Sequence, residues 1–196
     1  VCPSEDPKHG ARGMTADEVQ STITAFASAA ARAERAGFDG VELHGAHGYL
    51  LCQFLSSVLN RRTDRWGGSL ENRCRFAAEI ASRIRNMAGE DFIIGLAINL
   101  HPEVEASLSI EATQEVLAWF DQRALFDYVT CGTGSYFDFT GLIPSVFFPD
   151  KFGAPYAEAL KAVCKHIKVQ AESHIRTPEN AEYVISSGQA DTVSIV

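Results

Sequence analysis

The sequence predicts an α/β protein, a partial (β/α)8 barrel with about five βα units and parallel strands. Short apolar segments alternate with amphipathic segments of helical period, as in βαβ units around a parallel sheet. An open dinucleotide-binding sheet would normally carry a Gly-x-Gly-x-x-Gly turn, and the sequence has none. A complete barrel needs roughly 250 residues, whereas this chain has 196. We therefore expect residues 1–196 to form part of one barrel domain, without about three leading βα units and the closing helix.

The first predicted unit follows an irregular lead-in. Residues 1–13 are polar and show no periodicity. Thr15 and Glu18 have the spacing of a capping box, so a helix is expected to begin there and to end at Gly37. The alternating apolar pattern of residues 40–43 then predicts a buried strand.

The next two units repeat this order. Ser69 is the expected cap of a second helix, which ends near Gly89, and the apolar run 92–98 predicts a strand. Ser109 is the expected cap of a third helix, and residues 127–131 predict the strand that follows it.

The last two units are shorter. Residues 156–167 predict a helix and residues 169–171 a strand. Thr177 followed by proline is a typical helix start, and Gly188 is the expected end of that helix. The run 191–196 predicts the final strand.

Composition and charge are those of one globular domain, with 46% hydrophobic residues and a net charge of −8. The acidic balance argues against nucleic acid or an anionic membrane as the main partner. No apolar run approaches the roughly 18 residues of a membrane span. Five cysteines without C-x-x-C spacing indicate reduced thiols, a cytoplasmic setting and no zinc site. We expect a small-molecule substrate, and open strand edges make a homo-oligomer one expected state.

The most informative segment is the end of the first predicted strand, where His44, His47 and Tyr49 follow one another closely. Ligands bind at the carboxyl ends of strands in parallel α/β proteins. Two imidazoles can hold one electronegative atom between them, and a phenol can deliver a proton. These residues are therefore candidate catalytic groups. The alternatives are loop histidines with structural partners and a tyrosine that packs against its apolar neighbours.

Two loops that follow strands are long, residues 45–68 and 132–154, and both are expected at the carboxyl edge of the sheet. Within the first, residues 60–69 predict a structural clamp in which Asp64 pairs with an arginine. The second loop is either a wall over a flat ligand or a small satellite core. Its aromatic residues are Tyr136, Phe137, Phe139, Phe147 and Phe148.

A candidate phosphate site follows the fourth strand, where Ser173 and His174 precede a helix start. The loops after the last two strands of barrels often bind phosphate through backbone N–H groups, and His174 or Arg176 could add positive charge. The alternative is an ordinary solvated loop.

Several motifs at fixed spacing lie between the first strand and the second helix. They are His44-Gly-Ala-His47-Gly-Tyr49-Leu, Gln53-Phe-Leu-Ser, Asn60-x-Arg62-Thr-Asp64, Gly67-Gly-Ser-Leu-Glu-Asn-Arg73 and Arg75-Phe76. Together with the preceding Ala36-Gly-Phe-Asp-Gly-Val-Glu, they resemble the old yellow enzyme family of flavin oxidoreductases. The run from Gln170 to Glu182 is most similar to one branch. That branch contains trimethylamine dehydrogenase, dimethylglycine and N-methylproline demethylases, and 2,4-dienoyl-CoA reductase.

The resemblance implies a (β/α)8 barrel that binds FMN at its carboxyl mouth, with NAD(P)H as a candidate electron donor. His44 and His47 match the pair that binds the polar group of the substrate, and Tyr49 matches a tyrosine that donates a proton in ene-reductases. Ser173 and His174 match the loop that holds the FMN phosphate. The implied chemistry is hydride transfer to or from the flavin.

The chain departs from the family pattern in the second strand. Ala97 stands where relatives carry an arginine beside the flavin pyrimidine, a cation that would stabilise the anionic reduced flavin. The early strands that supply other flavin contacts are not in this sequence. The branch also has a 4Fe–4S cluster after the barrel, and its cysteine ligands are absent here, although a longer parent protein could carry them.

Oxidative N-demethylation of a small methylated amine or amino acid is the expected reaction. Alkene reduction, as by an ene-reductase or dienoyl-CoA reductase, is the nearby alternative. A barrel segment that no longer binds FMN is a second alternative, which Ala97 motivates. A lysine Schiff-base lyase is disfavoured, because no lysine ends a predicted strand.

Overall fold

A five-stranded parallel sheet forms the centre of the computed structural model, which describes residues 1–100, 108–135, 139–143 and 145–195. The strands lie side by side in chain order. They are β1 (Gly40–His44), β2 (Ile93–Leu100), β3 (Tyr128–Thr133), β4 (Lys168–Ala171) and β5 (Thr192–Val193). Five parallel strands in sequential order, each separated from the next by helix, form an arc of a (β/α)8 barrel. The predicted fold class is confirmed.

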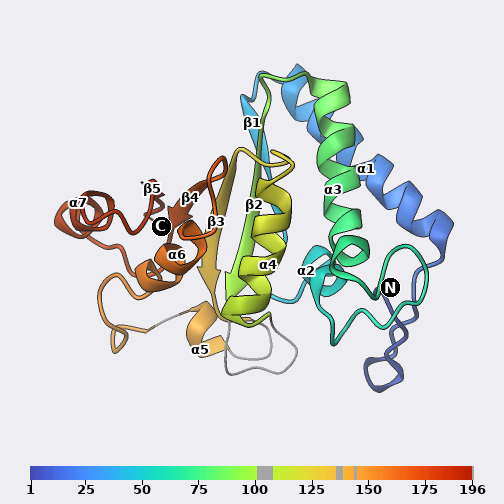
Figure 1. Cartoon of the computed structure of the whole chain (residues 1–196), viewed down its shortest axis with the longest axis horizontal. Helices are drawn as coiled ribbons and strands as arrows, with labels where there is room; N and C mark the ends of the chain where they lie inside the picture. Colours follow the sequence, from blue (N-terminus) through green and yellow to red (C-terminus); the bar gives the residue numbers. More distant parts are fainter. Residues whose placement is uncertain (101–107, 136–138, 144, 196) are drawn as a thin grey trace.

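Helices cover one face of this arc (Figure 1). The larger ones pack in order, α1 against α3, α3 against α4, and α4 against α6. The helices are η1 (Pro7–His9), α1 (Ala16–Arg35), α2 (Leu50–Leu55), α3 (Leu70–Ala88), α4 (Ile110–Asp121), α5 (Phe139–Leu142), α6 (Ala154–Lys161) and α7 (Pro178–Ser186).

The N-cap hydrogen bonds confirm the predicted helix starts. Thr15 and Glu18 form a complete capping box at the start of α1. The side chains of Ser69, Ser109 and Thr177 each accept a hydrogen bond from the backbone N–H three residues on. Local side-chain chemistry therefore fixes where four helices begin.

Side chains alternate between two faces of the sheet. The face toward the helices is apolar and fully buried, and it includes Leu43, Ile94, Leu96, Ile98, Val129, Cys131, Val169 and Ala171. On the opposite, concave face, the strand register aligns one residue from each strand in a single row. This row consists of His44, Ala97, Thr130, Gln170 and Thr192. The concave face is thus the polar side of the sheet, and it carries the predicted site.

Two predicted elements are shorter than expected. The helix predicted for residues 156–167 ends at Lys161, because the backbone N–H groups of residues 165–167 all donate to one carboxylate oxygen of Asp121. This tertiary contact replaces the last helical turn. The strand predicted for residues 191–196 is only β5, residues 192–193, and Val196 lies outside the described part of the chain.

The lead-in, residues 1–13, is more ordered than its composition suggests. It contains η1 and two isolated bridges, between Cys2 and Gly13 and between Asp6 and Ala11. Backbone pairing within the segment therefore supplies order that no hydrophobic periodicity could reveal.

The predicted clamp in residues 60–69 is confirmed and extends to the lead-in. Arg62 binds both carboxylate oxygens of Asp64, at 2.9 and 2.5 Å. Its remaining amino group donates to the backbone oxygens of Pro3 and Met14. A Cβ at Gly67 would lie 2.6 Å from the Arg62 carbonyl oxygen, so glycine is required for this close turn.

Aspartates hold the amino ends of the strands in register. Asp127, just before β3, accepts the backbone N–H of Ile94 in β2 at 2.6 Å. Asp191, just before β5, accepts the N–H of Val169 in β4 at 2.8 Å. Each turn thus fastens its strand to the preceding neighbour at the edge opposite the predicted site.

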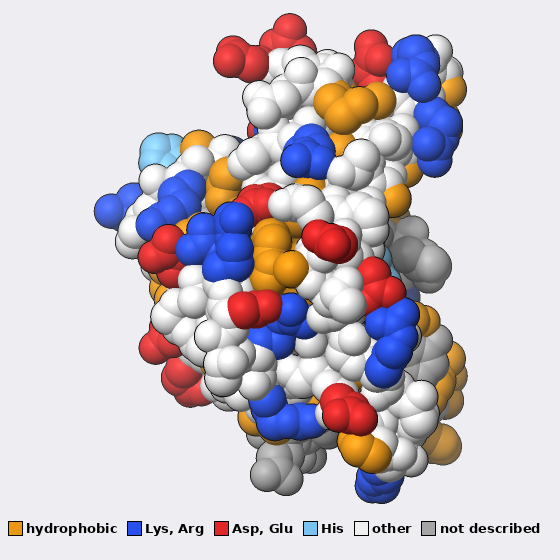
Figure 2. All heavy atoms as spheres, turned by 90° about the vertical axis from the view of Figure 1, so that its right-hand side faces the viewer, with side chains coloured by type: hydrophobic (Ala, Val, Ile, Leu, Met, Phe, Trp, Pro, Cys, Tyr) orange, Lys and Arg blue, Asp and Glu red, His pale blue; other side chains and the backbone are white. Residues whose placement is uncertain are grey.

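Figure 2 views the molecule from the right-hand side of Figure 1, and acidic and basic side chains are interspersed over this face. It therefore presents no extended field of one sign of the kind that binds polyanions. Within the described residues, no helix is both long and apolar enough to cross a membrane.

We predict that Asp121→Ala lowers the free energy of unfolding by about 3 kcal/mol, because three N–H groups lose their acceptor and that of Ile167 is buried. Urea unfolding would measure this loss. Glu115→Ala, an exposed change on α4, is the control and should stay within about 0.5 kcal/mol of the parent. An equal loss in the two variants would contradict the prediction.

We also predict that the contribution of Asp121 to the free energy of unfolding depends on pH. Burial opposes its ionisation, but the N–H groups of Ile167, His166 and Lys165 outweigh burial and hold the pKa of Asp121 below its ordinary value of 3.8. Its stabilisation is therefore complete above the unfolded pKa and is lost as the pH falls through the folded pKa. Below pH 4, the difference in the free energy of unfolding between the parent and Asp121→Ala should therefore become smaller, as urea unfolding would measure.

Candidate active site

The two histidines and the tyrosine predicted as catalytic groups come together at the carboxyl end of β1. The ring centroids of His44 and His47 lie 5.2 Å apart with an interplanar angle of 56°. Those of His44 and Tyr49 lie 5.0 Å apart at 52°. His44 is the last residue of β1, and the other two lie in the turn that leads to α2. Three groups that can hold or move protons therefore share one small region.

The backbone at His47 is left-handed, with φ 59°, an unusual conformation for a residue other than glycine. Asn99 of β2 supports it, because its buried side chain accepts the backbone N–H of His47 at 2.8 Å. The Asn99 amide also donates to the carbonyl oxygen of Gly134 at 2.5 Å. One buried amide therefore joins the loop after β1 to the loop after β3.

The His47 ring is half-buried, and this burial lowers its pKa below the usual histidine value. Repulsion from His44 lowers it further, while a hydrogen bond to the backbone of Thr133 opposes both. The imidazole of His47 is therefore neutral at pH 7. A neutral ring can donate one hydrogen bond and accept another.

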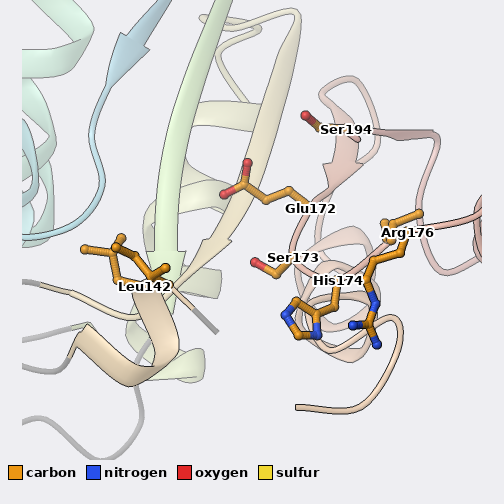
Figure 3. Close-up of a pocket in the computed structure, with 8 residues that line it drawn as sticks. Leu142, Glu172, Ser173, His174, Arg176 and Ser194 are labelled. Atoms are coloured by element: carbon orange, nitrogen blue, oxygen red, sulfur yellow. The ribbon is translucent and has the colours of Figure 1, made fainter. Parts of the chain in front are cut away.

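The predicted phosphate loop leaves β4 in a strained conformation. Ser173 and His174 both have positive φ, 73° and 60°. They line a cavity of about 470 Å³ together with Glu172, Arg176 and others. Figure 3 shows Glu172 and Ser173 turned toward β2 and β3, whereas His174 and Arg176 turn away from them.

The phosphate loop is fixed by the segment before α6. The carbonyl oxygens of Ser173 and His174 accept the N–H groups of Gly153 and Lys151, at 3.2 and 2.8 Å. Arg176 forms an ion pair with Asp150. These contacts hold the strained backbone in place without occupying the serine hydroxyl.

Thr133 connects the histidine pair to the phosphate loop. Its hydroxyl lies 2.9 Å from the Ser173 hydroxyl and donates to the Gly141 carbonyl oxygen at 2.8 Å. Its backbone contacts the His47 ring. The two predicted subsites are therefore parts of one connected region at the carboxyl edge of the sheet.

The aromatic loop is neither a single wall nor a single core. Phe148 packs edge-on against Phe152, with ring centroids 4.8 Å apart, and lies 6.2 Å from the His174 ring. Phe147 is 93% exposed and Phe139 51% exposed. Tyr136 and Phe137 lie outside the described residues. Phe148 therefore supports the phosphate loop, whereas Phe147 makes no contribution to a core.

Ala97, the departure from the family pattern, lies between His44 and Thr130 in the row on the concave face. A carboxylate, Glu42, shares this face and accepts the hydroxyl of Thr130 at 2.5 Å. Burial, then the charge of Glu42 and its hydrogen bond, raise the pKa of Tyr128 to about 12. Hydroxyl groups rather than a cation therefore face Glu42.

Sequence reasoning did not single out Asn99, Thr133 or Glu172 as functional residues. Asn99 ends an apolar run, and its position at a strand end was the one signal that could have drawn attention to it. The roles of Thr133 and Glu172 depend on strand register, which sequence patterning does not give.

The donor set at the β4 end fits a phosphate. Consecutive left-handed residues such as Ser173 and His174 are a backbone geometry that can bind anions, and the cavity adds the hydroxyls of Ser173 and Ser194, although Glu172 also lines it. The histidine pair provides hydrogen-bond donors for a polar substrate atom. The row of residues that contains Ala97 has no lysine or arginine, so the phosphate end fits FMN better than the pyrimidine end.

Fold and site together define a parallel-barrel segment whose carboxyl edge carries a pair of imidazole rings and the candidate phosphate loop. The chain belongs to the family described as NADH:flavin oxidoreductase / NADH oxidase, which matches residues 3–196. The resemblance to the old yellow enzyme family is thereby confirmed.

Individual relatives match nearly the whole chain. NADH oxidase of Thermoanaerobacter brockii is 37% identical over 184 residues, 94% of this chain and 28% of that protein. N,N-dimethylglycine/sarcosine dehydrogenase of Chromohalobacter salexigens is 31% identical, over 91% of this chain and 26% of that protein. The structure of 2-naphthoyl-CoA reductase in complex with 2-naphthoyl-CoA superposes with a TM-score of 0.85 at 28% identity, over 93% of this chain and 27% of that one. The chain therefore spans roughly a quarter of the length of these relatives.

We predict that Asn99→Ala frees the loop after β1, because the His47 N–H loses its acceptor. The His47 amide should exchange with solvent at least about tenfold faster, as measured by hydrogen-exchange NMR. Gln114→Ala, which removes an amide side chain from α4, is the control. Unchanged exchange at His47 in Asn99→Ala would show that another contact holds the loop.

Proposed function

We propose that this chain is part of an FMN-dependent oxidoreductase of the old yellow enzyme type, which acts on a small molecule. The observation that carries this proposal is the pair of imidazole rings, 5.2 Å apart, joined through Thr133 to Ser173 in the candidate phosphate loop. Family membership gives the same cofactor class. We further propose that residues 1–196 belong to a single FMN-binding domain.

Each site residue has a distinct proposed role. His44 and His47 hold a polar atom of the substrate by hydrogen bonds, and the neutral state of His47 lets it act as donor or acceptor. Tyr49 supplies or takes up a proton at the substrate. Backbone N–H groups of Ser173 and His174 bind the FMN phosphate. FMN, when bound, supplies the hydride acceptor or donor.

Oxidative N-demethylation of a small methylated amine or amino acid is the proposed reaction. It is supported by the sequence relative named N,N-dimethylglycine/sarcosine dehydrogenase. Alkene reduction with NAD(P)H as electron donor is the second candidate, supported by the likeness to 2-naphthoyl-CoA reductase and by Tyr49 close to His44. A 4Fe–4S cluster would have to be ligated by residues outside this sequence.

The cysteines support a proposed cytoplasmic setting, because all five are free thiols. Ala97 keeps open the alternative of a barrel segment that no longer binds FMN. Mixing purified protein with FMN separates these cases, since binding perturbs the flavin absorbance band and quenches its fluorescence. FMN absorbance and fluorescence that stay unchanged when the protein is added in excess would contradict the proposed function.

We predict that His44→Ala and His47→Ala in the full-length protein each lower kcat/KM by about 10²-fold or more, because each removes a hydrogen bond to the reacting substrate. Steady-state kinetics would measure the loss. His166→Ala, a histidine that precedes β4 at the opposite edge of the sheet, is the control. Equal turnover in the parent and both site variants would refute these roles.

Tyr49→Phe distinguishes the two candidate reactions. Alkene reduction needs a proton at carbon, so the loss of the phenol should slow it by about 10²–10⁴-fold. Amine oxidation delivers no proton to carbon and should slow by less than about tenfold. Parallel assays of a methylated amine and an activated alkene would show which substrate responds.

A further inference from the structure

The carboxyl group of Glu172, at the end of β4, lies near His47. Glu172 directly follows β4, and Figure 3 shows its carboxylate turned toward β2 and β3, away from Arg176. The side chain is half-buried and lines the cavity of the phosphate loop. Arg176 is paired with Asp150, so it does not neutralise Glu172.

Gly132 of β3 brings this carboxylate near His47. A Cβ at Gly132 would lie 2.7 Å from Oε1 of Glu172 and 3.3 Å from Nε2 of His47. Both groups therefore approach the same point beside Gly132, and the glycine, which has no side chain, leaves that space open. Any larger residue at this position would separate them.

We propose that Glu172 is the proton partner of His47, and that the two side chains share one proton through a water molecule in the space beside Gly132. The proton that leaves the carboxyl oxygen is taken up by a ring nitrogen, which gives a carboxylate and an imidazolium. The reverse transfer restores the neutral pair. This sharing is a property of the chain's own side chains, while its catalytic use rests on the proposed function.

The environments of Glu172 and His47 reduce the difference between their pKa values. Burial, and then the negative charge of Glu42, raise the pKa of Glu172. Burial, and then His44, lower the pKa of His47. An ordinary glutamate and histidine differ by about 2 pKa units, so these opposite shifts narrow the difference. Transfer between the two groups is correspondingly easier.

Other ionisable groups face this pair from several elements. From β1 and its loop come Glu42, His44 and, beside His44, Tyr49. The Cys131 thiol of β3 lies on the helix-facing side of the sheet, and its pKa is raised by burial and then by Glu172. His174 lies two residues after Glu172 in the phosphate loop, and its Nδ1 lies 3.2 Å from the carbonyl oxygen of Phe148. On the concave face, β2 contributes Ala97, and β5 contributes hydroxyl groups.

Histidine NMR of the purified chain tests the proposal without flavin. The His47 resonance is assigned by its loss in His47→Asn, and its titration is followed in the parent and in Glu172→Gln. We expect the His47 midpoint to fall by about one pH unit in Glu172→Gln, because the carboxylate no longer stabilises the imidazolium. Glu115→Gln, which removes an exposed carboxylate from α4, should leave the midpoint unchanged.

Gly132→Ala provides a second, independent variant. Its methyl group would displace the flexible Glu172 carboxyl, so the His47 midpoint should fall in the same direction by a smaller amount. If Glu172→Gln does not fold, the His47 midpoint in Gly132→Ala tests the proposal instead. A His47 midpoint within about 0.2 pH unit of the parent in the variants that fold would overturn the proposal. Failure to bind FMN would count against the proposed function alone, because the titration needs no cofactor.

Discussion

The register of five parallel strands is the constraint on which the rest of the structure depends. Because side chains alternate along each strand, one register places the fully buried apolar residues toward the helices and His44 and Asn99 on the opposite face. A shift by one residue in β2 would turn Asn99 toward the helices and Ile98 toward the site. The buried core and the candidate chemistry are therefore two results of the same alignment.

The site is held by few atoms that bridge different strands. The Asn99 amide joins the loops after β1 and β3, and Thr133 joins the histidine turn to the loop after β4. The loops after β1 and β4 each contain a residue with positive φ, His47 in the first and Ser173 in the second. Strained backbone of this kind persists where its surroundings hold it firmly. These bridges therefore maintain the geometry that a bound ligand would meet.

Much of the fold could be predicted from sequence because its signals are local. Thr15 and Thr177 cap helices through neighbouring N–H groups, and apolar runs mark the strands. The prediction failed for residues 162–167 because Asp121, more than forty residues away, caps those N–H groups. The histidine pair was visible because its members are close in sequence. Glu172 was not, because only register brings it to Gly132 and His47.

The aspartates at the amino edge of the sheet have a consequence for how such a protein can evolve. Asp127 and Asp191 fasten neighbouring strands at the end opposite the candidate site. Strand alignment is thus secured independently of the groups that perform chemistry. A replacement at a position such as Ala97 leaves both of these contacts in place, so the scaffold can tolerate change at the candidate site.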